Sequence, residues 1–268
     1  MTAKERIIYE LKEWGKALVY ALVFGTIIRL FVFETMMVPT GSMIPTIVPG
    51  DRLFIEKITY SVREPQLGDT VVFWAPFVDR RALQMLRPFD RFMDLFAPRE
   101  FKGHVKYVKR LVGKPGDILE LEPIPGSGGY YRLKVNGKVP EGFENRKYVR
   151  AGIFATPDFW RMMAYPDRYR SMVTSSFYEF LVYYNRTLDY TRYYEEHLKK
   201  YDIPKYVWKD AKTGRVKIRV PEDCYFFMGD NSPESFDCRY FGFVPVRNVI
   251  GSPLLRIWPF QRFGVLRK

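Results

Sequence analysis

A serine held in a rigid turn is the first residue of this chain that could do chemistry. Ser42 lies in residues 39–51, a stretch that contains three prolines and two glycines. Prolines and glycines at this density exclude a helix and hold the backbone in turn and extended conformations. A serine fixed on such a turn exposes its Oγ, as a nucleophile requires. The alternative is that residues 39–51 form only a hydroxyl-rich link between an anchor and a domain.

A lysine is the candidate base for this serine. The chain contains two histidines, His104 and His197, so a Ser-His-Asp triad has few candidates for its base. Residues 105–112 read as a strand, and the alternation of a strand places Lys109 on its more apolar face. Burial among apolar neighbours lowers the pKa of a lysine, and the neutral amine can then act as a base. The alternative is a solvated strand lysine.

A long polar turn is the third stretch of interest. Residues 229–245 follow an apolar strand at 225–228, and their Asp, Asn and Ser side chains can supply the hydrogen bonds that such a turn needs. Asp237 and Arg239 are spaced to form a charge-assisted pair that locks the turn.

A framework of β-strands must bring these three stretches together. Strands are predicted at 53–58, 70–74, 105–112, in a hairpin at 118–138, at 216–220 and at 225–228. Two segments interrupt the strand pattern: a basic and aromatic insertion at 78–103, and a segment at 141–209 with apolar residues at helical spacing. We therefore predict a mainly β chain, with a β catalytic domain formed by 34–140 and 210–268 and a helical inserted subdomain at 141–209.

A single hydrophobic run precedes the serine turn. Residues 17–33 are apolar apart from Arg29, and the run from residue 14 is long enough for one membrane crossing. Arg29 lies near one end, where its side chain can reach the interface. Because no small-residue cleavage site follows, we predict an uncleaved transmembrane anchor rather than a signal peptide.

The composition limits the partners and cofactors. A net charge of +13 favours acidic partners, either nucleic acid or anionic lipid headgroups, and the 17% aromatic content suits a membrane interface. Two cysteines, Cys224 and Cys238, cannot form a disulfide framework or a four-ligand zinc site. No metal or organic cofactor is expected.

Three stretches together resemble bacterial type I signal peptidases, the membrane-anchored Ser-Lys endopeptidases that remove signal peptides from secreted proteins. They are the Pro-Thr-Gly-Ser-Met-Ile-Pro-Thr turn at 39–46, the Tyr-Val-Lys-Arg-Leu-Val-Gly-Lys-Pro-Gly-Asp strand and turn at 107–117, and the turn at 229–245 that begins with Gly-Asp-Asn. The resemblance includes the anchor and the β core but not residues 78–103 or 141–209. It implies a signal-peptidase-like β fold.

The resemblance also implies roles for individual residues. Ser42 matches the nucleophile of the family and Lys109 its general base. Thr40 would complete the oxyanion hole together with the backbone amide of Ser42. Ser235 would orient the lysine ammonium, and the ion pair of the last turn would support the site. Cys238 stands where the family usually has serine, and we expect little effect from this difference.

Substrate, location and topology follow from the same resemblance. Met36, Met37 and Val38 would pair with the extended substrate by strand addition. The substrates would be signal peptides of exported preproteins with small residues at the first and third positions before the cut. The protein would cross the cell membrane once, with residues 1–16 in the cytoplasm and the catalytic domain on the outer or periplasmic side. The lipid bilayer is then a partner, and nucleic acid is not.

Two other functions remain open from the sequence. One is a related Ser-Lys peptidase dedicated to a single substrate, such as a conjugation or pilus factor. The other is a non-catalytic, membrane-tethered basic module that binds anionic lipid or nucleic acid. This module would explain the charge but not the joint presence of Ser42, Lys109 and the Asp237–Arg239 pair. The separation of Ser42 Oγ from Lys109 Nζ discriminates between the enzyme and the module.

Overall fold

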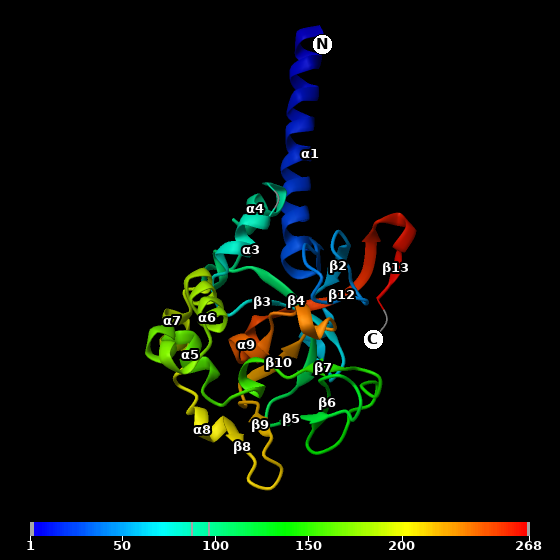
Figure 1. Cartoon of the computed structure of the whole chain (residues 1–268). Helices are drawn as coiled ribbons and strands as arrows, with labels where there is room; N and C mark the ends of the chain where they lie inside the picture. Colours follow the sequence, from blue (N-terminus) through cyan, green and yellow to red (C-terminus); the bar gives the residue numbers. More distant parts are fainter. Residues whose placement is uncertain (1–2, 87, 96, 267–268) are drawn as a thin grey trace.

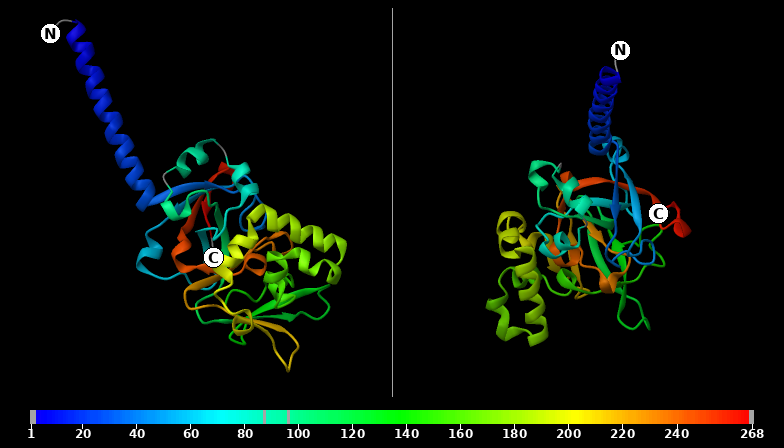
Figure 2. Two further views of the ribbon diagram at one scale, coloured as in Figure 1. Left: turned by 90° about the vertical axis from the view of Figure 1, so that its left-hand side faces the viewer. Right: turned by 90° about the horizontal axis from the view of Figure 1, so that it is seen from above.

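A long N-terminal helix stands apart from the rest of the molecule. The computed structural model describes residues 3–86, 88–95 and 97–266, and its helix α1 (Ala3–Phe31) projects away from the folded body (Figures 1 and 2). The helix is long and apolar enough to cross a membrane, and its apolar side chains are exposed. It ends at Phe31 rather than at residue 33, because Phe33 already pairs with Glu56 of a neighbouring strand.

A large antiparallel sheet contains the segments that the sequence singles out. Its strands, in order, are β1 (Phe33–Met37), β2 (Arg52–Glu56), β12 (Val249–Trp258), β3 (Thr70–Trp74), β4 (Lys106–Gly113), β10 (Cys224–Met228) and β11 (Val244–Pro245), with β13 (Gly264–Val265) beside β12. In the described part of the chain β1 pairs only with β2, so β1 is an edge strand. The strands predicted within this sheet are present, with ends that differ by one or two residues.

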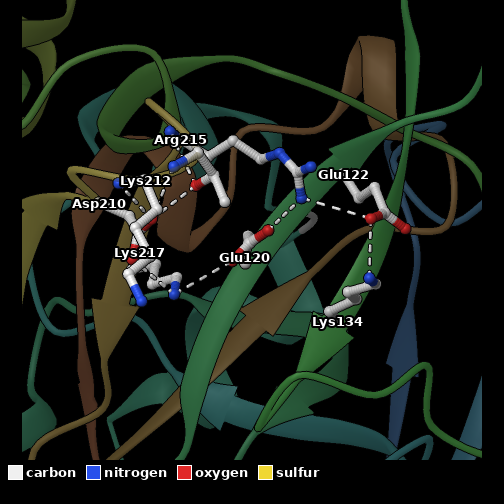
Figure 3. Close-up of polar contacts among 8 residues, drawn as sticks. Glu120, Glu122, Lys134, Asp210, Lys212, Arg215 and Lys217 are labelled. Atoms are coloured by element: carbon white, nitrogen blue, oxygen red, sulfur yellow. Dashed lines mark hydrogen bonds and ion pairs between the residues drawn. The ribbon is translucent and has the colours of Figure 1, made fainter.

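A smaller antiparallel sheet shares its apolar core with the large one. Its strands, in order, are β7 (Tyr148–Val149), β6 (Tyr130–Val135), β5 (Ile118–Pro123), β9 (Val216–Arg219) and β8 (Val207–Lys209). Charged side chains on β5, β6 and β9 and in the turn before β9 meet on its other side (Figure 3): Glu120, Glu122, Lys134, Asp210, Arg215 and Lys217. This alternation is typical of a sheet with one buried and one solvated face.

The segment at 141–209, for which the sequence predicts a helical subdomain, contains helices together with two short strands. Its helices are η2 (Gly152–Phe154), α5 (Phe159–Ala164), η3 (Pro166–Met172), α6 (Ser175–Leu188), α7 (Tyr190–Tyr193), η4 (Tyr194–Leu198) and α8 (Ile203–Tyr206). The strand β7 lies near the start of the segment and β8 lies at its end, and both belong to the small sheet. Its Trp160 packs edge-on against Phe243, with 5.0 Å between ring centroids. The segment therefore shares one continuous core with the β framework.

The segment at 78–103, which the sequence marks only as a basic and aromatic insertion, also contains short helices. These are α3 (Arg80–Met85), α4 (Pro88–Asp94) and η1 (Arg99–Phe101). Arg80 Nη1 donates a hydrogen bond to the carbonyl of Arg186 in α6, at 3.3 Å. The two insertions therefore touch each other. The remaining helices are short: α2 (Thr59–Val62), η5 (Ser232–Glu234), α9 (Cys238–Phe241), η6 (Val246–Asn248) and η7 (Phe260–Arg262).

Candidate active site

Ser42 and Lys109 meet in the structure. Lys109 Nζ donates a hydrogen bond to Ser42 Oγ, and Lys109 and Ser42 are only 5% and 6% exposed, respectively. Lys109 lies in the middle of β4, where Val71 of β3 is its partner in register. Ser42 lies in the turn that follows β1. A nucleophile hydroxyl and an amine in hydrogen-bond contact form the arrangement that proton abstraction requires.

Apolar residues that follow Ser42 fix the serine turn. Met43 and Ile47 are fully buried and pack in one cluster with Val108 of β4. The turn is closed by a backbone hydrogen bond from Ile47 to Met43, at 3.0 Å. Packing rather than helix propensity therefore determines where Ser42 points.

The environment of Lys109 lowers its pKa. Burial lowers the pKa of Lys109 to about 8, although the nearby Asp237 carboxylate acts in the opposite direction. Lys109 Nζ also lies 5.4 Å from the centroid of the Tyr107 ring. A free lysine has a pKa of about 10.4, so the buried amine is neutral far more often at neutral pH.

The polar turn 229–245 is hydrogen-bonded directly to the serine turn. The backbone N–H of Asn231 donates to the carbonyl of Ser42, and its Nδ2 donates to the carbonyl of Gly41, both at 3.0 Å. A Cβ at Gly229 would collide with Ser42 O and with the Ser235 side chain, so only glycine fits there. Sequence reasoning gave no role to Asn231 or Gly229. The signal that could have found them is the Gly-Asp-Asn that opens this turn.

Asp230 is a third residue that sequence reasoning missed. Arg110 Nε and Nη2 each donate to its carboxylate at 2.6 Å, Arg146 Nη1 donates at 2.8 Å, and Thr46 Oγ1 donates at 2.5 Å. Burial alone would raise the pKa of Asp230, but the hydrogen bonds and charge of Arg110 hold that pKa below its usual value. Arg110 follows Lys109 in β4, and Thr46 belongs to the serine turn. The Asp230 carboxylate therefore links β4 to the serine turn.

The Asp237–Arg239 pair is completely buried beside the site. Arg239 Nε and Nη2 donate to the two carboxylate oxygens of Asp237, each at 2.8 Å, and Asp237 also accepts the backbone N–H of Gly229 at 2.9 Å. Burial would raise the pKa of Asp237, but Arg239 holds it below its usual value. The pair therefore fixes Gly229, which contacts the serine turn.

Ser235 and Thr40 lie near the site without side-chain hydrogen bonds to it. Ser235 is buried against Gly229, and its Oγ has no hydrogen-bond partner among the described residues, Lys109 included. Thr40 is exposed and lines the same cleft as Ser42. Its hydroxyl is therefore open to a ligand in that cleft.

A cleft of about 370 Å³ opens onto Ser42 and Lys109. Met36 of the edge strand β1 and Val38 just after it line this cleft. Met37 does not line this cleft; it lines a neighbouring pocket, to which Met36 also contributes. The insertions supply another part of its wall, through Asp79, Arg81, Ala82 and Met85 around α3 and through Tyr184, Thr187 and Leu188 of α6. Neither histidine lines this cleft.

Comparison with known proteins identifies the family. The model of the family "Signal peptidase, peptidase S26" matches residues 11–258. The "Probable signal peptidase I-2" of Synechocystis sp. is 30% identical over 254 residues, which are 95% of this chain and 76% of that protein. The signal peptidase I of Haemophilus influenzae is 30% identical over 267 residues, which are 93% and 70% of the two chains. A solved signal peptidase I from Enterococcus faecalis V583 aligns with 71% of this chain and 97% of its own, at 20% identity and a TM-score of 0.29. The chain therefore belongs to the S26 family of signal peptidases, serine peptidases that cleave the signal peptides of exported proteins.

Proposed function

We propose that this signal peptidase is anchored in the membrane by α1 and works with Ser42 as nucleophile and Lys109 as general base. The observation that supports this most strongly is the buried hydrogen bond between Lys109 Nζ and Ser42 Oγ. Ser-Lys pairs are a known alternative to the histidine triad. The lowered pKa of Lys109 fits the role, because a base must be neutral before it can take a proton.

The proposed reaction runs in two halves. In the first, neutral Lys109 takes the proton of Ser42 while Oγ attacks the scissile carbonyl, and the ammonium then gives that proton to the leaving amine of the mature protein. In the second, Lys109 deprotonates a water that attacks the acyl-enzyme, and Ser42 recovers its proton as the signal peptide leaves with a new carboxylate. The oxyanion would be bound by the Ser42 backbone N–H and the Thr40 hydroxyl, as the family resemblance implies.

The substrate segment would bind as an added strand. β1 lacks a partner on its outer side in the described part of the chain, and an edge strand offers its free backbone groups to an extended peptide. Met36 and Val38 line the cleft at the end of this edge. The segment 36–38 would therefore lead the peptide towards Ser42.

The proposed topology puts residues 1–16 in the cytoplasm and the catalytic domain on the outer or periplasmic side. The exposed apolar helix α1 supports the anchor. The charge of +13 and the exposed Trp258 and Phe260 suit contact with anionic lipid. Protease added to intact spheroplasts should digest the large domain, and full protection would overturn this orientation.

Three variants of the full-length enzyme test the mechanism. Ser42→Ala, Lys109→Ala and Lys109→Arg should each abolish cleavage of a signal-peptide substrate with alanine at the first and third positions before the cut. Arginine fails because it keeps its proton at any accessible pH. His197→Gln is the matched control and should keep full activity. Substantial activity in Lys109→Arg would exclude lysine as the base.

A narrower substrate range is the second candidate. Tyr184 and Leu188 of the inserted helix α6 form part of the cleft wall, and wall side chains that clash with unsuitable peptides would limit the enzyme to few substrates. A panel of unrelated signal peptides separates the two possibilities, because a general signal peptidase cleaves most of them. The third possibility, a non-catalytic basic module, has no support from a family of peptidases.

A further inference from the structure

A buried carboxylate lies at the joint between α1 and the large sheet. Glu34, in β1, is only 5% exposed. Lys106 Nζ lies 2.7 Å from its Oε1, and Lys57 Nζ lies 3.1 Å from its Oε2. Burial alone would raise the pKa of Glu34, but the two lysines hold that pKa below its usual value. Glu34 is therefore a charged carboxylate, held between two cations, just beyond the end of the helix.

Lys57 connects this carboxylate to the end of α1 itself. Its Nζ donates to the carbonyls of Arg29 at 2.9 Å and Leu30 at 3.4 Å, and its backbone N–H donates to the carbonyl of Val32 at 2.9 Å. The last carbonyls of a helix lack partners within the helix, and a cation there also complements the helix dipole. Lys57 follows β2 in sequence, so a residue of the folded body caps the helix that leaves it.

Lys106 connects the same carboxylate to the strand that bears the lysine of the site. It is the first residue of β4, three positions before Lys109. Its Nζ also lies 4.7 Å from the centroid of the Trp74 ring in the neighbouring strand β3. A continuous path of polar contacts therefore runs from the end of α1 through Lys57 and Glu34 to β4.

The surroundings show why such a bridge is needed. The end of α1 adjoins a hollow of about 330 Å³, lined by Arg29, Leu30, Glu34, Lys57 and residues of the folded body. Figures 1 and 2 show that α1 otherwise extends away from the folded body. A helix joined mainly at one end can change its angle unless bonds at that end prevent it. The Lys57 and Glu34 contacts are such bonds.

We propose that Lys57 and Glu34 are positioning residues that fix the direction of α1 relative to the Ser42–Lys109 site. This inference rests on the proposed function, in which α1 spans the membrane. A signal peptide in the same bilayer presents its cleavage site at a set height and angle, so the direction of the anchor decides whether that site reaches Ser42. A soluble peptide diffuses freely into the cleft, and its cleavage does not depend on the anchor.

The test compares two substrates on the same full-length enzyme. The first is a preprotein inserted into liposomes that contain the enzyme, and the second is a soluble peptide with the same cleavage sequence, offered to the enzyme in detergent. Lys57→Met should lower kcat/KM for the inserted preprotein by on the order of tenfold to a hundredfold, as displacing reacting groups by about 1 Å does. It should leave kcat/KM for the soluble peptide unchanged.

Two further variants sharpen this comparison. Lys57→Arg keeps a cationic donor and should restore cleavage of the inserted preprotein. Lys134→Met is the matched control, because it also removes a lysine from an ion pair, with Glu122 at 2.7 Å, but in the small sheet. Glu34→Gln should act like Lys57→Met, since it removes the charge while keeping the shape.

Each outcome decides the inference. Equal rates for Lys57→Met and wild type on both substrates would overturn it, because the anchor direction would not depend on this contact. An equal loss on both substrates would also overturn it, since Lys57 would then act on the folding of the cleft. The proposed mechanism is judged separately: it fails if Lys109→Arg is active, whatever the ratio of the two rates in Lys57→Met.

Discussion

Lys109 Nζ donates a hydrogen bond to Ser42 Oγ across 67 positions of the chain. Ser42 comes from a turn after an edge strand, while Lys109 comes from the interior of the same large sheet. Both side chains are buried, so the amine has lost most of the water that would stabilise its charge. The protonation of one lysine is therefore expected to control the activity.

The pH dependence of cleavage should follow Lys109. Because the base must be neutral and burial lowers its pKa to about 8, kcat/KM should rise as the pH increases through that value and then level off. Below the pKa it should fall about tenfold for each pH unit, since the neutral fraction falls by that factor. Measurement of kcat/KM from about pH 6 to about pH 10 checks this. A rate that increases on acidification would contradict it.

Local patterns predict only part of the site. Strand alternation places Lys109 on the more apolar face of its strand but leaves a solvated lysine open. Proline and glycine density predicts the turn of Ser42, although the serine is buried and not exposed as such a turn suggests. The sequence places the end of the anchor at residue 33 because the apolar run continues to Phe33. In the structure Phe33 belongs to β1 and pairs with β2, so the helix ends before it. An apolar pattern alone does not distinguish a helix residue from a strand residue at such a boundary.

Contacts between distant parts of the chain could not be predicted from patterns. Asn231 donates a hydrogen bond to the carbonyl of Gly41, 190 positions away in the chain. Asp230 accepts a hydrogen bond from Thr46, 184 positions away. Nothing in the composition of either turn specifies these partners. The placement of α6 against the cleft likewise depends on how the insertion docks, and the helical spacing of its apolar residues predicts only a helix.

Loss of the Thr40 hydroxyl should slow turnover without unfolding the protein. Thr40→Ala should reduce kcat by on the order of 10²–10³, as removal of one oxyanion donor does. The exposed side chain makes no hydrogen bond within the described residues, so stability should not change. Thr40→Ser keeps a hydroxyl and should retain most of the activity. Equal kcat values for the alanine variant and wild type would remove Thr40 from the oxyanion hole.

A methyl group at Gly229 should disturb the site through packing. In Gly229→Ala the new Cβ would overlap Ser42 O and the Ser235 side chain, so the serine turn must shift. Overpacking of this kind costs about 1–3 kcal/mol, and a shifted nucleophile should also lower kcat. Chemical denaturation and turnover measure the two effects. Gly15→Ala in α1 is the control, because a Cβ there meets no atom within 4 Å. Wild-type turnover in Gly229→Ala would show that this contact does not position Ser42.

Removing the charge of Asp237 should destabilise the protein at neutral pH. Asp237→Asn leaves the buried guanidinium of Arg239 without its counter-ion, which costs about 3–5 kcal/mol of unfolding free energy. Denaturation of the full-length protein in detergent at pH 7 measures this loss. Asp158→Asn is the matched control, because its pair with Arg161 is exposed and should matter little.

The stability difference between the wild type and Asp237→Asn should depend on pH if the charge of Asp237 is its cause. The pKa of Asp237 is lower in the folded protein than in the unfolded chain. The ion pair should therefore contribute its full stabilisation to the wild type above about pH 4, the ordinary pKa of an aspartate. As the pH falls below that value and approaches the folded-state pKa, the wild type should lose this contribution, while Asp237→Asn has none to lose. The two denaturation midpoints should therefore converge on acidification. A difference that stays constant down to about pH 2, well below the ordinary pKa, would mean that the variant acts through packing and not through the buried ion pair.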